Sequence, residues 1–248
     1  MPLMDEFKEE REAIKNASFK ERFSYFWCYY KWHVIGTIIA IAVVGSFVYQ
    51  YITHKENAFY VVVLNSYAYP SAQDYTDNLA EIFELDTSKE QVLFDTSVYV
   101  DFKSNDQRTM TSAQKIIVYM ASNELDLMIS DTKSLEYYLY NDTFLDLTTV
   151  LTPEQVEKYK DRFYYIDKEL LIALKDQATD KLFSMDFPEN PYDPDSITDP
   201  VPVGLNVSDQ KDFLDNYGFQ STDLIMCPVA NTLNIEKIQK YVDYVFSN

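Results

Sequence analysis

The sequence predicts an α/β protein in which one membrane-spanning helix precedes a three-layer α/β domain. Three observations lead to this prediction: an uncharged run near the N-terminus, an alternation of strand-like and helix-like segments after it, and an acidic surplus confined to that later part. We divide the chain into a cytoplasmic amphipathic juxtamembrane helix (1–33), a transmembrane signal anchor (34–53), a linker (54–58) and an extracellular α/β domain (59–248).

The membrane prediction rests on the 19 residues from Val34 to Ile52, which include no charged side chain. At about 1.5 Å per helical residue they reach about 28 Å, which matches a bilayer core. Aromatic residues gather near both ends, as at the two faces of a membrane: Phe26, Trp27, Tyr29, Tyr30, Trp32, Tyr49 and Tyr51. The alternative, a cleavable signal peptide, requires a shorter N-terminal region and a small-x-small cleavage site, and the chain has neither.

Lysine and arginine set the expected orientation. Six of them precede the uncharged run, whereas after Lys55 none follows until Lys89. The positive-inside rule therefore places the N-terminus in the cytoplasm and the C-terminal domain outside, in a single-pass cell-membrane protein. Two interpretations of the first 33 residues remain open: an amphipathic helix on the inner leaflet or against a partner, and a solvated extension of the spanning helix.

Composition excludes several function classes. The net charge is −19, and residues 1–55 hold 7 basic and 6 acidic side chains, which leaves a net charge of −20 for the remainder. A surface this acidic repels phosphate, so we expect no nucleic-acid partner; it favours cationic ligands, although a solvated acidic surface is its commoner meaning. With 4 Gly, 2 His and 2 Cys, the sequence predicts no phosphate-binding loop, no metal site, no cofactor and no catalytic constellation, hence no enzyme.

The first half of the outer domain alternates strands and helices. Residues 59–65 form an apolar run that suits a strand buried on both faces, and 71–85 have apolar residues at helical spacing. Residues 92–100 are β-branched and alternating, so they predict a second strand. A helix is expected at 106–122, with one apolar face: Met110, Ala113, Ile117 and Met120. An apolar third strand (126–130) and a short helix (132–141) complete a β-α-β-α-β-α order, which implies a parallel sheet with helices on both faces.

The pattern of the second half is looser. Thr152 before Pro153 predicts a helix N-terminus, with the helix reaching about Tyr159. Residues 162–176 favour a strand followed by a hairpin, and the proline-rich 187–202 a loop or hinge. Short strands are expected at 203–208 and 223–230, with a helix at 210–218 that Gly218 stops. The chain closes on an amphipathic helix whose apolar residues are Ile235, Ile238, Tyr241, Val242 and Val245.

Polar residues at the ends of the predicted strands are the candidate ligand contacts, because ligands of parallel sheets bind beyond the carboxyl ends of strands at the topological switch point. They are Asn65, Ser66, Tyr67, Tyr69, Ser130, Asp131 and Asn206. Ordinary turn chemistry is the alternative, and for Ser130 and Asp131 a helix N-cap is the stronger interpretation. Three further carboxylates, at Asp193, Asp195 and Asp199, have a spacing that calcium accepts, but the central glycine and terminal glutamate of an EF-hand are missing.

Several phrases resemble extracellular solute-binding proteins of ABC importers. They are ASNELDLMISDTKSLEYYLYNDTFLDLTTVL, with its Phe144-Leu145-Asp146-Leu147 phrase, VPVGLNVSD, and the closing LIMCPVANTLNIEKIQKYVDYVF. The block YFWCYYKWHVIG resembles a juxtamembrane signature of anchored proteins from Gram-positive bacteria. The domain is shorter than that family's members and has a signal anchor in place of a lipobox cysteine. The resemblance thus implies a shortened, membrane-anchored relative with a periplasmic-binding-protein-like domain and a reduced second lobe.

Two functions follow from this resemblance. The first is a tethered domain that captures a small solute or peptide, closes near the 187–202 loop, and presents its ligand to a membrane partner such as a transporter. The second is a non-catalytic structural or interaction subunit of a membrane complex, with a vestigial ligand cleft. A polar cleft favours the first function, and an exposed apolar patch favours the second.

Overall fold

The structure, a computed structural model, describes residues 18–101, 107–139, 143–175 and 187–247. The chain divides into two compact units, Met1–His54 and Lys55–Asn248, and each is described by itself. Residues 1–17 of the predicted cytoplasmic segment lie outside the described residues.

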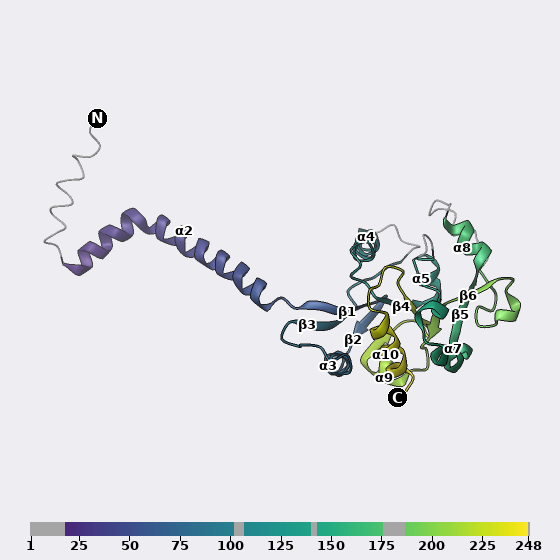
Figure 1. Ribbon diagram of the computed structural model, residues 1–248. Coiled ribbons are helices and arrows are strands. Elements are labelled where there is room, and N and C mark those ends of the chain that lie inside the picture. The colour runs from purple at the N-terminus through teal and green to yellow at the C-terminus, as the bar shows by residue number, and fades with distance from the viewer. Residues whose placement is uncertain (1–17, 102–106, 140–142, 176–186, 248) are drawn as a thin grey trace. The chain divides into compact units, whose positions relative to one another are not determined.

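The described part of the first unit is one long helix, α2, Phe19–Thr53 (Figure 1). Ser18 begins it with a capping box, in which its hydroxyl accepts from the Glu21 N–H while the Glu21 carboxylate accepts from the Ser18 N–H. Among the residues that the structure describes, one helix is long and apolar enough to cross a membrane, namely the 24 residues Tyr30–Thr53 of α2. These residues include the predicted span and, at about 1.5 Å each, measure about 36 Å.

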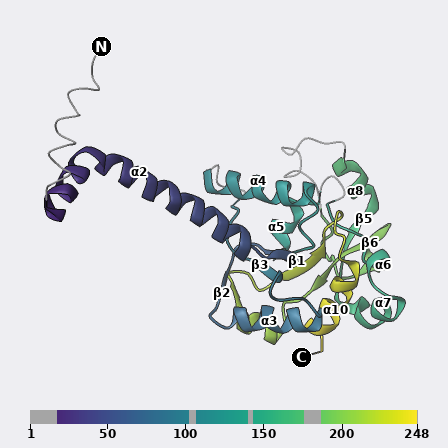
Figure 2. The same cartoon turned by 60° about the vertical axis from the view of Figure 1, so that its left-hand side comes forward.

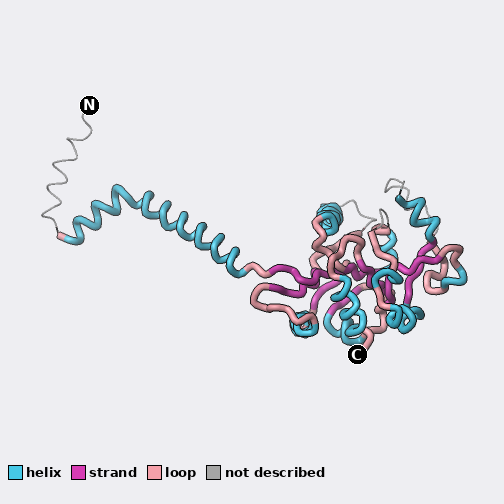
Figure 3. The backbone as a smooth tube through the Cα atoms, viewed as in Figure 1, coloured by secondary structure: helices cyan, strands magenta, loops and turns pink. Residues whose placement is uncertain are grey.

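The second unit is built on a six-stranded sheet with the order β3-β1-β4-β8-β6-β5. Figure 3 draws its strands in magenta. The strands are β1 Glu56–Val63, β3 Glu90–Asp95, β4 Leu127–Asp131, β5 Phe163–Asp167, β6 Pro200–Asn206 and β8 Leu224–Pro228. The first strand pairs in parallel with β3 and with β4, as the sequence predicts. The other three join by antiparallel pairing, so the sheet is mixed. A separate antiparallel ribbon joins β2, Ser66–Ala68, to β7, Tyr217–Phe219.

Helices cover both faces of the sheet, which confirms the three-layer α/β prediction. They are α3 Ala72–Ile82, α4 Gln107–Ala121, α5 Thr132–Glu136, α6 Leu147–Val150, α7 Pro153–Tyr159, α8 Lys168–Lys175, α9 Lys211–Asn216 and α10 Ile235–Val245. Figure 2 shows α4 on one side of the sheet and α3 and α10 on the other. The alternation of side chains along β1 explains the two layers: Phe59, Val61 and Val63 pack with α3 and α10, whereas Tyr60, Val62 and Leu64 pack with α4.

The predicted strand 92–100 and the predicted face of α4 are both wrong in part, and for the same reason. The strand ends at Asp95, after which the chain leaves the sheet. Backbone N–H groups of the departing segment then need acceptors. Two side chains of α4 supply them, since Tyr99 N–H donates to Ser112 (3.3 Å) and Asp101 N–H to Thr109 (3.1 Å). Thr109, Ser112 and Ile116 are therefore the buried residues of α4, while Met110 and Ile117 are exposed.

Two further expectations need correction. The segment after β5 is the helix α8 rather than a hairpin, because its sequence, KELLIALK, consists almost entirely of strong helix formers. Gly218 does not stop a helix: α9 ends at Asn216, and Gly218 lies in β7 under the ring of Tyr67. A side chain there would meet the ring, since an added Cβ would lie 2.6 Å from Tyr67 Cε2.

The proline-rich stretch is a loop as far as Asp199, with a 3-10 turn at Pro194–Ser196, and β6 begins at Pro200. It covers the outer edge of β5, where the Tyr165 N–H donates to the Pro191 carbonyl at 2.7 Å. An edge strand covered in this way offers fewer free backbone groups to other chains. The predicted helix after β4 is shorter than expected, because α5 ends at Glu136, and residues 140–142 lie outside the described residues.

Candidate functional site

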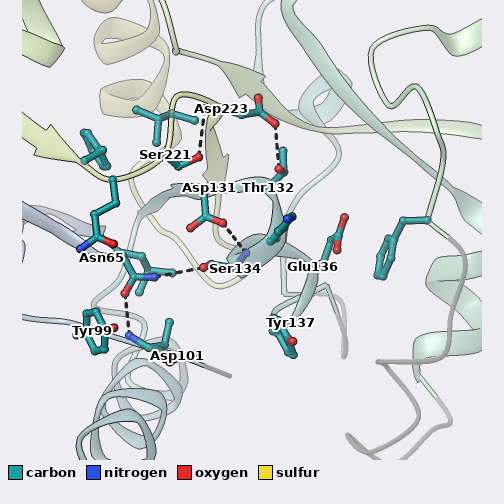
Figure 4. A pocket seen from close by; sticks show the side chains of 17 residues that line it. Asn65, Tyr99, Asp101, Asp131, Thr132, Ser134, Glu136, Tyr137, Ser221 and Asp223 are labelled. Carbon is teal, nitrogen blue, oxygen red and sulfur yellow. Dashed lines mark hydrogen bonds between the residues drawn. The ribbon is translucent and has the colours of Figure 1, made fainter. Parts of the chain in front are cut away.

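The candidate site is a cavity of about 850 Å³ at the carboxyl ends of β1 and β4 (Figure 4). The chain passes from β1 to β3 on one side and later to β4 on the other, so this is the topological switch point of the parallel strands. Segments from four parts of the domain line it: the end of β1, the segment 99–101, residues 131–137, and the segment 219–224 that leads into β8. Phe187 completes the lining.

Asn65 holds three of these segments together. Its backbone is left-handed, with a φ of 51°, a conformation that asparagine tolerates better than most residues. Its side-chain oxygen accepts from the Val100 N–H at 2.9 Å, and its amide nitrogen donates to the Ser134 hydroxyl at 3.3 Å. The floor of the cavity at this point is therefore fixed by hydrogen bonds rather than by apolar packing alone.

Two carboxylates of the lining are also held by donors. Asp131 caps α5, accepting from the Ser134 N–H at 3.0 Å. Asp223 accepts from the Thr132 hydroxyl at 2.9 Å and from the Tyr192 hydroxyl at 2.7 Å. Burial and the hydrogen bond to Asp223 raise the pKa of Tyr192, so this phenol stays protonated as a donor. These bonds connect α5, the proline-rich loop and the segment before β8.

Glu136 differs from those carboxylates. It is partly buried at the end of α5, and within the described part of the chain its carboxylate accepts no hydrogen bond and forms no ion pair. Burial raises the pKa of Glu136 from 4.5 to about 7; Asp131 adds to the rise and Lys133 opposes it. Near neutral pH, this side chain is poised between its two protonation states and its charge lacks a paired cation.

The lining as a whole is acidic and aromatic. Among the described residues, the charged members of the lining are four carboxylates and one lysine: Asp101, Asp131, Glu136, Asp223 and Lys133. Its aromatic residues are Tyr99, Tyr137, Phe187 and Phe219. The guanidinium of Arg108 lies 4.6 Å from the centre of the Tyr99 ring, so this ring already contacts a cation of the chain itself. Burial, and then the charges of Glu136 and Asp101, raise the pKa of Tyr137, which keeps its hydroxyl neutral.

Of the seven residues predicted as ligand contacts, Asn65 and Asp131 line this cavity. Ser130 is fully buried and donates to the Asp131 carbonyl, and Ser66 donates to the Val63 carbonyl at 2.7 Å. Asn206 accepts from the Ser208 N–H at 2.9 Å, which is turn chemistry.

The two tyrosines lie elsewhere. Tyr67 and Tyr69 are exposed on and beside β2, with their hydroxyl oxygens 3.1 Å apart. Tyr69 borders a separate hollow of about 350 Å³. Neither residue belongs to the lining of the larger cavity.

The sequence interpretation missed Glu136 and the whole segment 219–224. Because β8 is antiparallel to β4, the residues before it, not those after it, reach the carboxyl edge of β4. A pattern of apolar residues does not reveal strand direction, so no signal pointed to this segment. Glu136 could have been found, since the helix after a strand end begins at the same edge and here is only 5 residues long.

No metal centre emerges among the described residues, where no group of three or more His, Cys, Asp or Glu side chains is placed to hold an ion. In the acidic loop, Asp193 accepts from the Asp195 N–H at 3.1 Å and begins the 3-10 turn. Comparison of the chain with protein-family models, with curated proteins and with solved structures finds no match.

Proposed function

We propose that residues 55–248 form a membrane-tethered extracellular domain that binds a small organic cation in the cavity at the carboxyl ends of β1 and β4. The observation that supports this most is the cavity itself, at about 850 Å³ within the usual range for small-molecule sites. Its location at the topological switch point is where parallel sheets bind their ligands.

The lining supports a cationic ligand. The described lining residues include four carboxylates and one lysine, and Glu136 has no hydrogen-bond or ion-pair partner among the described residues. Aromatic rings beside the carboxylates suit a ligand that joins a positive charge to an apolar body. The positive charge of such a ligand is attracted both by the carboxylates and by the faces of the rings. An amine, a guanidine or a short basic peptide has this chemistry.

We further propose that the domain is a shortened relative of the solute-binding proteins of Gram-positive ABC importers. The parallel unit β3-β1-β4 with its cleft supports this relationship. The described residues of Lys55–Asn248 belong to one compact unit, which favours capture in an open cleft of a single lobe. A reduced second lobe, and its closure near the 187–202 loop, stay predictions.

The tether would hold the domain at the outer surface of the cell membrane. The basic residues before the span support a cytoplasmic N-terminus. Only His54 and Lys55 separate α2 from β1, and Leu64 and Asn65 at the far end of β1 line the cavity. Eight residues of strand, at about 3.3 Å each, put about 26 Å between chain entry and cavity.

Thermal unfolding of residues 55–248 tests the proposal, with putrescine, spermidine, arginine and choline compared with glutamate, glucose and an uncharged peptide. A cation at 100 times its dissociation constant should add about 2.7 kcal/mol to the free energy of unfolding, or about 5 to 10 °C for a domain of this size. A shift with glutamate or glucose alone would overturn the ligand class. No shift across the panel would overturn the binding function.

A second candidate function has its own observation. The outer face of α4 exposes three apolar side chains, Met110, Ile117 and Val118. Such a face supports the alternative of a non-catalytic interaction subunit of a membrane complex. Chemical cross-linking of the full chain in its native membrane, comparing Val118→Glu with Gln73→Glu on the exposed surface of α3, tests it. Loss of a cross-linked partner with the first variant only is the expected result for this alternative.

A further inference from the structure

The first three turns of α2 form an apolar surface that extends well beyond the aromatic residues next to the membrane span. Five aromatic residues share it: Phe19, Phe23, Phe26, Trp27 and Tyr30. All five are exposed, from 45% for Tyr30 to 85% for Phe19. At 3.6 residues per turn they fall within an arc of about 100°, the width of the buried face of an amphipathic helix.

The stripe is ordered along its length. Phe23 stacks on Trp27 with ring centroids 6.2 Å apart, and Phe26 stacks on Tyr30 at 5.3 Å. The capping box at Ser18 fixes the start of the helix directly before Phe19. The rings thus form one continuous apolar face rather than separate exposed side chains.

Length shows why the span leaves this face unexplained. The candidate span begins at Tyr30, so Phe19 precedes it by 11 residues, or about 17 Å of helix. The headgroup region on each side of a bilayer core is only about 5 to 8 Å deep. A helix that continued straight along the membrane normal would therefore place Phe19 and Phe23 in water. Figures 1 and 2 both show the first turns of α2 bending away from the long remainder of the helix.

We infer that Phe19–Tyr30 lies along the headgroup region of the inner leaflet, with its aromatic stripe toward the acyl chains and anionic lipid as its partner. This inference rests on the membrane tether of the proposed function, and it is continuous with that tether. Lys20 and Lys31 lie on the helix just beyond one edge of the stripe, about 20° and 40° from Trp27, where they meet anionic headgroups. The opposite face, with Glu21 and Cys28, is turned to water, and Ser24 lies on the water side of Lys31, about 110° from the middle of the stripe.

Tryptophan fluorescence tests this directly, because Trp27 and Trp32 are the only 2 tryptophans of the chain. Both are replaced by Phe in the full-length protein, and a single reporter is introduced as Phe19→Trp. The matched control is Ser24→Trp, on the water-facing side of the same turns. Each protein is reconstituted in vesicles of phosphatidylcholine and phosphatidylglycerol, with iodide as the aqueous quencher and bromine-labelled lipid as the membrane quencher.

We expect the Phe19→Trp emission to shift to the blue, to resist iodide and to be quenched by bromine placed near the headgroup. The Ser24→Trp emission should stay red-shifted and open to iodide. Equal quenching of the two reporters by iodide overturns the inference, because a straight helix in water exposes both. Shielding of Phe19→Trp that disappears on dilution with lipid also overturns it, because the face would then bind a second helix. A blue shift of equal size in vesicles of phosphatidylcholine alone would refute the claim that anionic lipid is the partner.

The tether has a separate readout. A protein with a single tryptophan introduced as Ile41→Trp, near the middle of the candidate span, reports on the span itself. If this tryptophan is quenched by bromine deep in the acyl region while Phe19→Trp is exposed, the tether stands and the stripe inference fails. If neither reporter is shielded, the membrane tether itself is refuted, and the stripe inference that rests on it is refuted with it.

Discussion

Glu136→Gln should make the free domain more stable at neutral pH and weaken its binding of cations. Glutamine keeps the shape of the side chain, but it removes a carboxylate that is partly buried and has no partner among the described residues. Burial raises the pKa of Glu136 from 4.5 to about 7. That difference corresponds to about 3 kcal/mol of cost when the group is ionised, at about 1.4 kcal/mol for each pKa unit. Because the side chain keeps some contact with water, we expect Glu136→Gln to recover about 1 to 2 kcal/mol.

The increase in the free energy of unfolding that Glu136→Gln brings should depend on pH in a defined direction. Between pH 4.5 and about 7 the folded domain holds a proton on Glu136 that the unfolded chain has released, so wild-type stability falls as pH rises through this window. The stability difference between Glu136→Gln and wild type should therefore be absent at pH 4, grow through the window and level off above pH 7. Urea unfolding of residues 55–248 at several pH values measures it, and thermal unfolding should differ by about 2 to 8 °C at pH 8.

The cation affinity of the wild type should rise with pH, whereas its stability falls. A bound cation favours the ionised form of Glu136, so cation affinity should rise with pH through about 7 in the wild type and lose this dependence in Glu136→Gln. Glu81→Gln, on the exposed surface of α3, is the matched control and should change neither property. A variant that is no more stable than wild type at pH 8 would refute the reasoning, because it would mean that the Glu136 charge already has a favourable partner.

Substitutions at three positions test the packing and hydrogen bonding of the domain. Gly204→Ala should lower the free energy of unfolding by about 1 to 3 kcal/mol in urea unfolding, because an added Cβ would lie 2.6 Å from Cys227 Sγ and still closer to Ile225. Adding Cys227→Ala should restore part of this stability. No loss of stability in Gly204→Ala would contradict the close packing. Asp126→Ala should cost about 2 to 4 kcal/mol, since the buried carboxylate accepts three hydrogen bonds; a change under 1 kcal/mol in urea unfolding would rule out that role. Asn65→Ala should lower the free energy of unfolding by about 2 kcal/mol and Asn65→Gly by about 1 kcal/mol. Both variants lose the same hydrogen bonds, but glycine adopts the left-handed backbone without strain. A glycine variant that is less stable than the alanine variant in thermal unfolding would argue against backbone strain.

The sequence predicted what local patterns determine. The strand β1 is apolar on both faces and is buried on both, and the Thr152–Pro153 signal begins α7 with a capping box completed by Gln155. The apolar face of α10 is buried as expected. In these segments the side-chain pattern and the packing agree, so the short-range signal was sufficient.

The failures share a cause in hydrogen bonding between distant segments. Counting apolar residues assigns Met110 and Ile117 to the core, but the polar Thr109 and Ser112 are buried instead, because the chain beyond β3 requires their oxygens. The site residues behave in the same way. Asp223 reaches the cavity through the direction of β8, and its contact with Thr132 spans 91 residues of sequence. No local pattern encodes a contact of that kind.

The carboxylates of the lining differ in their hydrogen-bond partners, and this difference is a further argument for a ligand. Asp131 and Asp223 accept hydrogen bonds that hold α5, the proline-rich loop and the segment before β8 in place, so their presence is explained by the architecture. Glu136 has no such structural task among the described residues, and its burial makes its ionised form unfavourable. A leucine or glutamine at this position would serve folding better. A cation that enters between Glu136 and the aromatic wall would compensate for that cost, because it supplies the missing opposite charge within a site whose other members are already fixed.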